Sequence, residues 1–292
     1  MIDLRSDTVT LPTEEMREAM RVAELGDDAR EGDPTVRRLE TAAAAAVGKE
    51  AAVFVTSGTM ANLVALLAHG RRGGEVLLDA EAHILRSEMG AIAQLAGLFH
   101  RTIPGRRGAP DLRALRAMLN PELGANRLAT SLVSIETTHN SAGGAVVPLA
   151  TLQAVRAMTA EHGIPVHIDG ARVFNAAVAL GVPAADIARH GDSVCFCVSK
   201  GLSAPFGSLI CGTATFIERA FSFWHRPTHG RGCVAARSAS AGADRRACAR
   251  PRPARFSSRS RPPGAARRSD RPSVRRTRRP ASAGCERRTA ER

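Results

Sequence analysis

One of the two lysines in this chain stands where it could act as a nucleophile. Lys49 follows Val47-Gly48 at the end of a predicted helix, where a solvated charge is ordinary. Lys200 follows the apolar segment 193–199 and precedes Gly201. An amine in apolar surroundings has a lowered pKa and can attack a carbonyl carbon. Considered alone, such a lysine is more often a surface charge at the end of a strand, with its stem lying along apolar neighbours.

A carboxylate occupies the same kind of position after a second apolar segment. Asp169 follows residues 165–168 and precedes Gly170-Ala171-Arg172. A lysine and a carboxylate at one sheet edge meet two requirements of pyridoxal phosphate chemistry. The amine forms a Schiff base with the aldehyde, and the carboxylate keeps the pyridine nitrogen protonated. The alternative is a structural pair of Asp169 with Arg172, and that interpretation predicts no partner lysine.

A third element is a polar turn between a predicted strand and a predicted helix. Ser57-Gly58-Thr59 lies where the apolar run 51–56 ends and the helical pattern 59–68 begins. Backbone N–H groups at a helix start lack intrahelical partners and attract anions, so this turn can seat a phosphate group. Most such turns are simple helix caps. The pattern becomes specific for this cofactor only because a possible phosphate-binding turn, Asp169 and Lys200 follow one another in this order along the chain.

With these residues identified, the chain resembles the low-specificity L-threonine aldolases, in the β-eliminating lyase group of fold-type-I pyridoxal phosphate enzymes. The resemblance covers roughly residues 1–220, and the blocks DLRSDTVT, HIDGAR and SKGL make it specific. The matching stretches are residues 3–10, 26–28, 33–36, 57–62, 83, 136–144, 167–172 and 199–208.

The resemblance implies a role for each part of a pyridoxal phosphate site. Lys200 would hold the cofactor covalently, and Asp169 would pair with its pyridine nitrogen. Residues 57–59 would bind the phosphate, and His83 would stack on the ring. Arg172 would reach the phenolate oxygen of the ring or the carboxylate of the substrate. No metal is expected.

The resemblance also implies the reaction, which is cleavage of the Cα–Cβ bond of L-threonine or L-allo-threonine to glycine and acetaldehyde. Ser6 would help Arg172 to hold the substrate carboxylate, and His139 would lie near the β-hydroxyl group. Cleavage needs a base for the hydroxyl proton. His83, His139 and an ordered water all stay open for that role.

The elements that must position these residues alternate between helical and strand patterns, which predicts parallel strands with helices on both faces of the sheet. In such sheets, ligands bind at the carboxyl ends of the strands. We therefore expect an α/β fold, the large domain of fold-type-I pyridoxal phosphate enzymes. The predicted helices are 35–46, capped by Thr35, 59–68, 88–97, 112–119 and 149–162. The predicted strands are 51–56, 75–78, 128–136, 165–168, 193–199 and 208–211.

Three parts of the chain are predicted. Residues 1–25 are an N-terminal arm, residues 26–220 are the cofactor-binding large domain, and residues 221–292 are a tail rich in Arg, Pro and Ala. The tail is too poor in large apolar side chains to offset its ordering entropy, which predicts disorder. The family's small C-terminal domain is not visible after Phe221, and the composition of the tail is what an out-of-frame reading of a G+C-rich gene would produce.

The net charge of +13 does not describe the predicted enzyme. Residues 226–292 hold 20 arginines and 4 acidic residues, a net charge of +16, whereas the first 225 residues hold 21 basic and 24 acidic residues. An Arg-rich arm that binds nucleic acid is therefore a remote alternative. It lacks the aromatic interleaving of stacking modules, and we expect no specific nucleic-acid partner.

The sequence also leaves open which reaction the chain carries out and whether the product is active. It could be a related pyridoxal phosphate lyase or racemase acting on another β-substituted amino acid, or an inactive product with an aberrant C-terminus. The expected partners are a small amino-acid substrate and further copies of the chain, as a homodimer or homotetramer. No secretory signal, Cys-x-x-Cys pair or membrane-spanning apolar run is visible, so we expect a cytoplasmic protein without a membrane partner.

Overall fold

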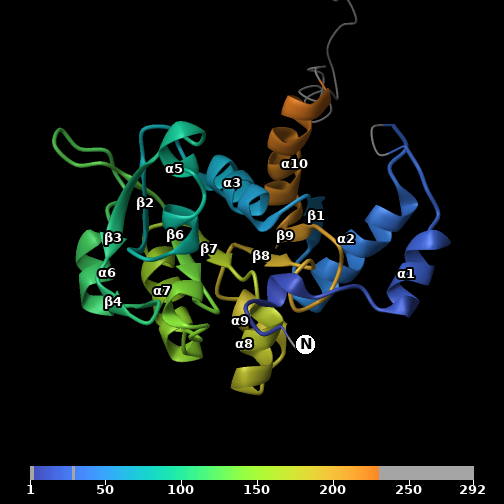
Figure 1. The fold of residues 1–292 in the computed structure, drawn as a ribbon. Coiled ribbons are helices and arrows are strands. Elements are labelled where there is room, and N and C mark those ends of the chain that lie inside the picture. Colours follow the sequence, from blue (N-terminus) through green and yellow to red (C-terminus); the bar gives the residue numbers. More distant parts are fainter. Residues whose placement is uncertain (1–2, 28–29, 230–292) are drawn as a thin grey trace, which may run out of the picture. The chain divides into compact units, whose positions relative to one another are not determined.

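A seven-stranded sheet with the strand order β1-β9-β8-β7-β6-β2-β3 organises the computed structural model, which describes residues 3–27 and 30–229 (Figure 1). Its strands are β1 (Ala51–Val55), β2 (Glu75–Asp79), β3 (Phe99–Ile103), β6 (Thr130–Glu136), β7 (Val166–Asp169), β8 (Ser193–Cys197) and β9 (Ser208–Gly212). Only β9 among them runs antiparallel to its neighbours, β8 and β1. The predicted mostly parallel sheet is therefore confirmed. A short separate hairpin joins β4 (Gly105–Arg106) to β5 (Ala109–Pro110).

Helices cover both faces of this sheet, as the sequence pattern predicts (Figure 1). One face packs against α2 (Pro34–Ala46), α6 (Leu112–Met118), α7 (Leu149–Ala160), α8 (Val173–Leu180) and α9 (Ala184–Ala188). The other packs against α3 (Gly58–His69), α4 (His83–Arg86), α5 (Ala91–Gln94) and α10 (Ala214–His229). The remaining elements are η1 (Asp7–Val9), α1 (Glu14–Arg21) and η2 (Asn140–Ala142). The buried strands β6, β7, β8 and β9 thus hold their ends at fixed positions between two apolar layers.

The first predicted helix, 35–46, is present as α2, but its cap differs from the prediction. Asp33, not Thr35, is the N-cap residue, and its carboxylate accepts the N–H of Val36 at 2.9 Å. Pro34 then occupies the first helical position, where its missing N–H costs nothing and its fixed φ angle suits the helix. An Asp-Pro pair is therefore the stronger start signal in this segment.

The predicted helix at 88–97 is largely wrong. Only Ala91–Gln94 are helical there, and a separate short helix, α4, precedes them. The cause is the backbone between the two helices, where Met89 has a φ of 53° and Gly90 a φ of 71°. Left-handed backbone at two successive residues cannot continue a right-handed helix.

The other predicted helices and strands agree with the structure to within about two residues at most ends, the usual uncertainty of element boundaries. The elements that were not predicted include the edge strand β3, the β4–β5 hairpin and the helices α1, α4, α8, α9 and α10. Helix α10 crosses position 220, the predicted end of the large domain. Residues 230–292, which hold most of the predicted tail, lie outside the described residues. Within the described part of the chain, no helix is both long enough and apolar enough to cross a membrane.

Candidate active site

A cavity of about 230 Å³ opens where β6, β7 and β8 end. It lies at the carboxyl edge of the sheet, the place that the strand pattern predicts for a ligand. Its lining residues are Ser57, Gly58, Thr59, Asn62, His83, Glu88, Glu136, Asn140, Asp169, Ala171, Arg172, Cys197, Ser199 and Lys200. The structure therefore brings together all the residues that the sequence analysis assigns to the cofactor.

The first turn of α3 forms one wall of the cavity. Ser57 caps this twelve-residue helix, and its hydroxyl accepts the N–H of Met60 at 3.2 Å. Gly58 approaches the end of β8 so closely that an added Cβ atom would lie 2.9 Å from the sulfur of Cys197. The backbone can approach an anion at this position because glycine carries no side chain. The turn has the shape and the N–H donors of a phosphate seat.

Lys200 forms the opposite wall, in the turn after β8. Its carbonyl oxygen accepts hydrogen bonds from the Thr10 hydroxyl at 2.6 Å and from the Ser203 N–H at 2.9 Å. These two bonds fix the backbone from which the half-buried side chain extends. Within the described residues, the amine of Lys200 makes no hydrogen bond or ion pair of its own. The backbone of Lys200 is thus held in place, and its amine is available to act as a nucleophile.

Asp169 closes the floor of the cavity at the end of β7. It is only 4% exposed, and its Oδ1 atom accepts the N–H of Ala171 at 3.1 Å. Its Oδ2 atom accepts a hydrogen bond from the Asn62 amide at 2.8 Å. These two hydrogen bonds fix the orientation of the carboxylate. This carboxylate can therefore accept a further proton donor from the cavity, such as a pyridinium N–H group.

His83 begins α4 and is held by two carboxylates. Its ring Nδ1 lies 2.9 Å from Oε1 of Glu88, and its backbone N–H donates to Oε2 of Glu136 at 2.6 Å. The hydrogen bond to Glu88 raises the pKa of His83. Burial raises the pKa values of both Glu88 and Glu136. Because Glu88 orients Nδ1, the opposite ring nitrogen, Nε2, is left for proton transfer.

Arg172 lines the cavity but is already engaged by the N-terminal segment. Its Nε and Nη2 atoms donate to the two carboxylate oxygens of Asp7 at 2.6 and 2.8 Å. Its Nη1 atom lies 3.4 Å from the side-chain oxygen of Asn140. Ser6 does not line the cavity, and its hydroxyl accepts the N–H of Thr8 at 3.2 Å instead. The N-terminal segment thus reaches the site through Asp7.

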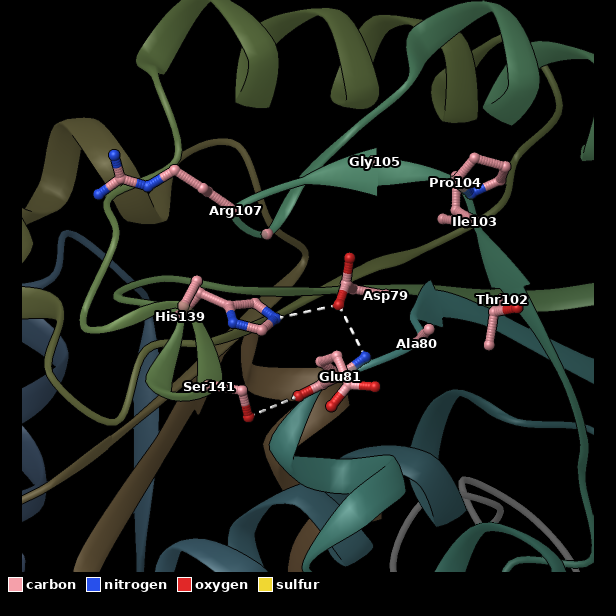
Figure 2. Close-up of a pocket in the computed structure, with 12 residues that line it drawn as sticks. Asp79, Ala80, Glu81, Thr102, Ile103, Pro104, Gly105, Arg107, His139 and Ser141 are labelled. Atoms are coloured by element: carbon pink, nitrogen blue, oxygen red, sulfur yellow. Dashed lines mark hydrogen bonds and ion pairs between the residues drawn. The ribbon is translucent and has the colours of Figure 1, made fainter.

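His139 lies in a different cavity, of about 390 Å³, at the ends of β2 and β3. Figure 2 shows its ring directed at Asp79, whose Oδ1 is 3.2 Å from Nε2. Of the residues that the structure describes, none lines both cavities. His139 is 1% exposed, and its Nδ1 has no hydrogen-bond partner among the described residues. The structure does not bring His139 together with Lys200 and Asp169.

Several residues at the cavity were not predicted as functional. Asn62 lies one helical turn after Thr59, so its spacing of three residues could have indicated it. Glu136 ends β6 in the same way that Asp169 ends β7, so the rule of strand ends could have found it. Glu88 carries no such signal. It follows α4, a helix that the sequence pattern did not predict.

These residues fit pyridoxal phosphate. The free amine of Lys200, the buried carboxylate of Asp169 and the first turn of α3 meet at one cavity, and these are the three anchors that the cofactor requires. His83, Glu88 and Asp169 also place ligand atoms within 4.8 Å of one another, which is close enough for a metal ion. However, the Asn62 amide donates to both carboxylates, so a cation would have to displace it.

The chain matches the β-eliminating lyase family over residues 3–250. It is 46% identical over 222 residues to low-specificity L-threonine aldolase 1 of Arabidopsis thaliana, covering 75% of the chain and 62% of that protein. It is 42% identical over 231 residues to the low specificity L-threonine aldolase of Escherichia coli, covering 79% of the chain and 68% of that protein. The chain thus spans about two thirds of the length of these relatives.

A solved structure supports the same fold. The threonine aldolase of Leishmania major superposes on the chain with a TM-score of 0.61 and 22% sequence identity. The match covers 73% of this chain and 62% of that one. At this identity the similarity concerns the arrangement of the sheet and helices alone.

Proposed function

The chain belongs to the β-eliminating lyase family, and on that premise we propose that it is a pyridoxal phosphate-dependent lyase. It would cleave the Cα–Cβ bond of L-threonine or L-allo-threonine to give glycine and acetaldehyde. The observation that carries the proposal is the single cavity lined by Lys200, Asp169 and the first turn of α3. The names of the curated relatives support the choice of substrate.

The cofactor-binding roles follow from the contacts already described. Pyridoxal phosphate, when bound, supplies a ring that accepts the electrons released at Cα. Lys200 would bind it covalently through Nζ, and Asp169 would accept the N–H of its pyridine nitrogen. Ser57, Gly58 and Thr59 would hold its phosphate at the start of α3, where the helix dipole favours an anion.

Arg172 and Ser6 would bind the substrate carboxylate. The Nη1 atom of Arg172 faces Asn140, whereas the other two nitrogens, Nε and Nη2, bind Asp7. A guanidinium can hold a second carboxylate there, because it carries five donors in a fixed plane. Ser6 is the neighbour of Asp7, so the same ion pair holds it near the site.

We infer that His83, rather than His139, is the base for the β-hydroxyl proton. His83 lines the Lys200 cavity, and Glu88 fixes its Nδ1. As the hydroxyl proton leaves for Nε2, the C–O bond becomes the carbonyl of the aldehyde, and the pair of electrons from the Cα–Cβ bond stays with Cα. His139 would instead have a structural role, through its contact with Asp79 at the end of β2.

We further propose a cytoplasmic homo-oligomer. The N-terminal segment exposes large apolar side chains, Leu4 at 89%, Leu11 at 73% and Leu25 at 86%. Several exposed leucines on one segment favour a protein interface. Cys195, Cys197 and Cys211 are buried free thiols, which suit a reducing compartment. The mass in solution, measured by light scattering after gel filtration, tests the oligomer, and a monomer would refute it.

Because the chain has only two lysines, attachment of the cofactor to Lys200 can be tested directly. Purified protein would be loaded with pyridoxal phosphate and reduced with borohydride, and the modified peptide would be identified by mass spectrometry. The chain has only one other lysine, Lys49, whose amine donates to the carbonyl of Gly191 at 2.6 Å. We expect the adduct on Lys200 and loss of the visible absorbance band in Lys200→Ala but not in Lys49→Ala. An adduct on Lys49, or none, would reject the proposal.

The reaction is tested by its products. L-threonine and L-allo-threonine would each be supplied to the loaded protein, and glycine and acetaldehyde would be quantified. Equal amounts of both products support cleavage between Cα and Cβ. Inverted amino acid without acetaldehyde would indicate a racemase instead, and binding of the cofactor without any turnover would indicate an inactive product.

A further inference from the structure

A continuous line of buried and partly buried polar side chains runs behind Asp169, from the end of α3 to the cavity. His69 Nε2 lies 2.8 Å from the Ser193 hydroxyl, which lies 2.8 Å from Nδ1 of His167. Nε2 of His167 lies 3.0 Å from the side-chain oxygen of Asn62. Ser193 and His167 are fully buried, and Asn62 is 2% exposed. We call these four residues the His69–Asn62 relay.

The chemistry of Asn62 fixes the direction of every bond in the relay. Its amide nitrogen lies 2.8 Å from Oε1 of Glu88 and 2.8 Å from Oδ2 of Asp169, which both act as acceptors. Both amide hydrogens are therefore used, and the amide oxygen must face His167. A flipped amide would place its oxygen against two carboxylates, which is unfavourable.

The orientation of the Asn62 amide then determines which ring nitrogen carries the hydrogen in each of the two histidines. His167 must donate from Nε2 to Asn62, so its Nδ1 accepts the hydroxyl hydrogen of Ser193. Ser193 can then accept the Nε2 hydrogen of His69. Burial keeps both rings neutral, because it lowers the pKa of His167 to about 4 and that of His69 to about 3. His69 is itself held by stacking on Phe216, with ring centroids 4.4 Å apart.

We propose that the His69–Asn62 relay positions Asp169 for the pyridine nitrogen of the cofactor, and that Asn62 couples this to the orientation of His83 through Glu88. This inference rests on the proposed function. A donated N–H limits the rotation of the Asp169 carboxylate, so that its remaining lone pairs face the cavity. The same amide nitrogen holds the oxygen of Glu88 that contacts His83. Asn62 thus aligns both Asp169, which would contact the pyridine nitrogen, and His83, the proposed base.

The first test needs no cofactor. In protein labelled with ¹⁵N-histidine, the ring of His167 is assigned by the signal that is absent from His167→Asn. We expect a neutral ring protonated at Nε2 and unprotonated at Nδ1 at neutral pH. A ring protonated at Nδ1 alone, or at both nitrogens, would contradict the bond directions on which the inference depends.

The second test compares two substitutions of the same residue by their affinity for pyridoxal phosphate. In His167→Gln, the amide nitrogen reaches the position of Nε2 and can still donate to Asn62. In His167→Asn, the amide reaches only the position of Nδ1, so this donor is lost. We expect the dissociation constant to stay within about threefold of wild type for His167→Gln and to rise about tenfold for His167→Asn. A merely structural histidine would make the two variants weaken binding alike.

Controls separate this inference from the proposed function. Ser131→Ala removes a buried hydroxyl that has no hydrogen-bond partner in the described part of the chain, and it should leave the dissociation constant unchanged. If the variants of His167 do not fold, the near-isosteric Asn62→Asp replaces both N–H donors by an acceptor and should weaken binding about tenfold or more. Normal binding by folded Asn62→Asp would overturn the positioning role. If the wild-type protein does not bind pyridoxal phosphate, the proposed function and the positioning role both fail, and the histidine signals still report the bond directions.

Discussion

Arg172, three residues after the end of β7, forms a two-point ion pair with Asp7 of the N-terminal segment, with distances of 2.6 and 2.8 Å. Both side chains are about three-quarters buried or more. The pair lowers the pKa of Asp7, because the Arg172 guanidinium donates to its carboxylate. The N-terminal segment is therefore fixed to the candidate active site by a contact whose strength depends on pH.

The first prediction concerns this pair and stability. A carboxyl group whose pKa is lowered by folding stabilises the fold above its unfolded pKa, here 3.8, and loses this effect as the pH falls through the folded value. Asp7→Asn should therefore lower the free energy of unfolding by about 1–2 kcal/mol at pH 7. Urea unfolding should show this difference shrinking well below pH 3.8.

A matched control is available four residues earlier. Asp3 pairs with Arg5 on the surface, where the arginine side chain is 82% exposed. Exposed pairs contribute little to stability, so Asp3→Asn should change the unfolding free energy much less than Asp7→Asn does. Equal losses in Asp3→Asn and Asp7→Asn, or a loss in Asp7→Asn that does not depend on pH, would contradict the prediction.

The second prediction concerns His83 and Glu88. The hydrogen bond to Glu88 raises the pKa of His83 above 6.5, so Glu88→Gln should lower it. The pKa can be read directly by NMR titration of the histidine ring. Since a base must be neutral to accept a proton, the acid limb of kcat/KM should move to lower pH in the same variant. Glu81→Gln is the control, because Glu81 is exposed and pairs with Arg86.

Two outcomes would oppose this prediction. A His83 pKa that is the same in wild type and Glu88→Gln would show that the carboxylate does not act on the ring. A shifted ring pKa with an unshifted acid limb would show that His83 is not the base. In that case, an ordered water would become the leading candidate.

Strand ends explain why much of the site could be predicted from the sequence. Lys200 and Asp169 each follow an apolar run, and parallel strands bring such ends to one edge. Ser57 marks the start of α3 by its type alone. These three inferences need only local patterns and one rule of topology, so they do not depend on how side chains pack.

The remaining features depend on packing that no local pattern encodes. His139 lies three residues after the end of β6, as Lys200 lies three residues after the end of β8, yet its ring turns to Asp79 in the neighbouring cavity. Glu88 lies in the turn between α4 and α5, next to left-handed backbone at Met89 and Gly90, and no sequence pattern marks this turn. The spacing of Asn62 from Thr59 could have placed it at the cavity, but its contacts are with carboxylates that are 26 and 107 residues away in sequence.

The third prediction separates the two histidines by the same substitution. In His83→Asn, the amide can keep the contact with Glu88 but has no group at the position of Nε2. We expect kcat to fall by about 100-fold, the range of a lost general base. His139→Asn should instead lower the free energy of unfolding by about 1–2 kcal/mol, because it loses the bond to Asp79, and change kcat by less than about threefold. A larger loss of kcat in His139→Asn than in His83→Asn would reverse the assignment.

The fourth prediction concerns the phosphate seat. In Gly58→Ala, the new Cβ atom would lie 2.9 Å from the sulfur of Cys197, so the first turn of α3 must shift. A shift of the N–H donors weakens anion binding, and we expect the dissociation constant of pyridoxal phosphate to rise about tenfold. Gly124→Ala is the control, because its Cβ atom would meet only an ordinary contact at 3.8 Å. Equal binding by both variants, measured by titration of the apoprotein, would place the phosphate away from α3. Weaker binding in Gly58→Ala alone would support the seat, because the two substitutions add the same methyl group and differ in what it meets.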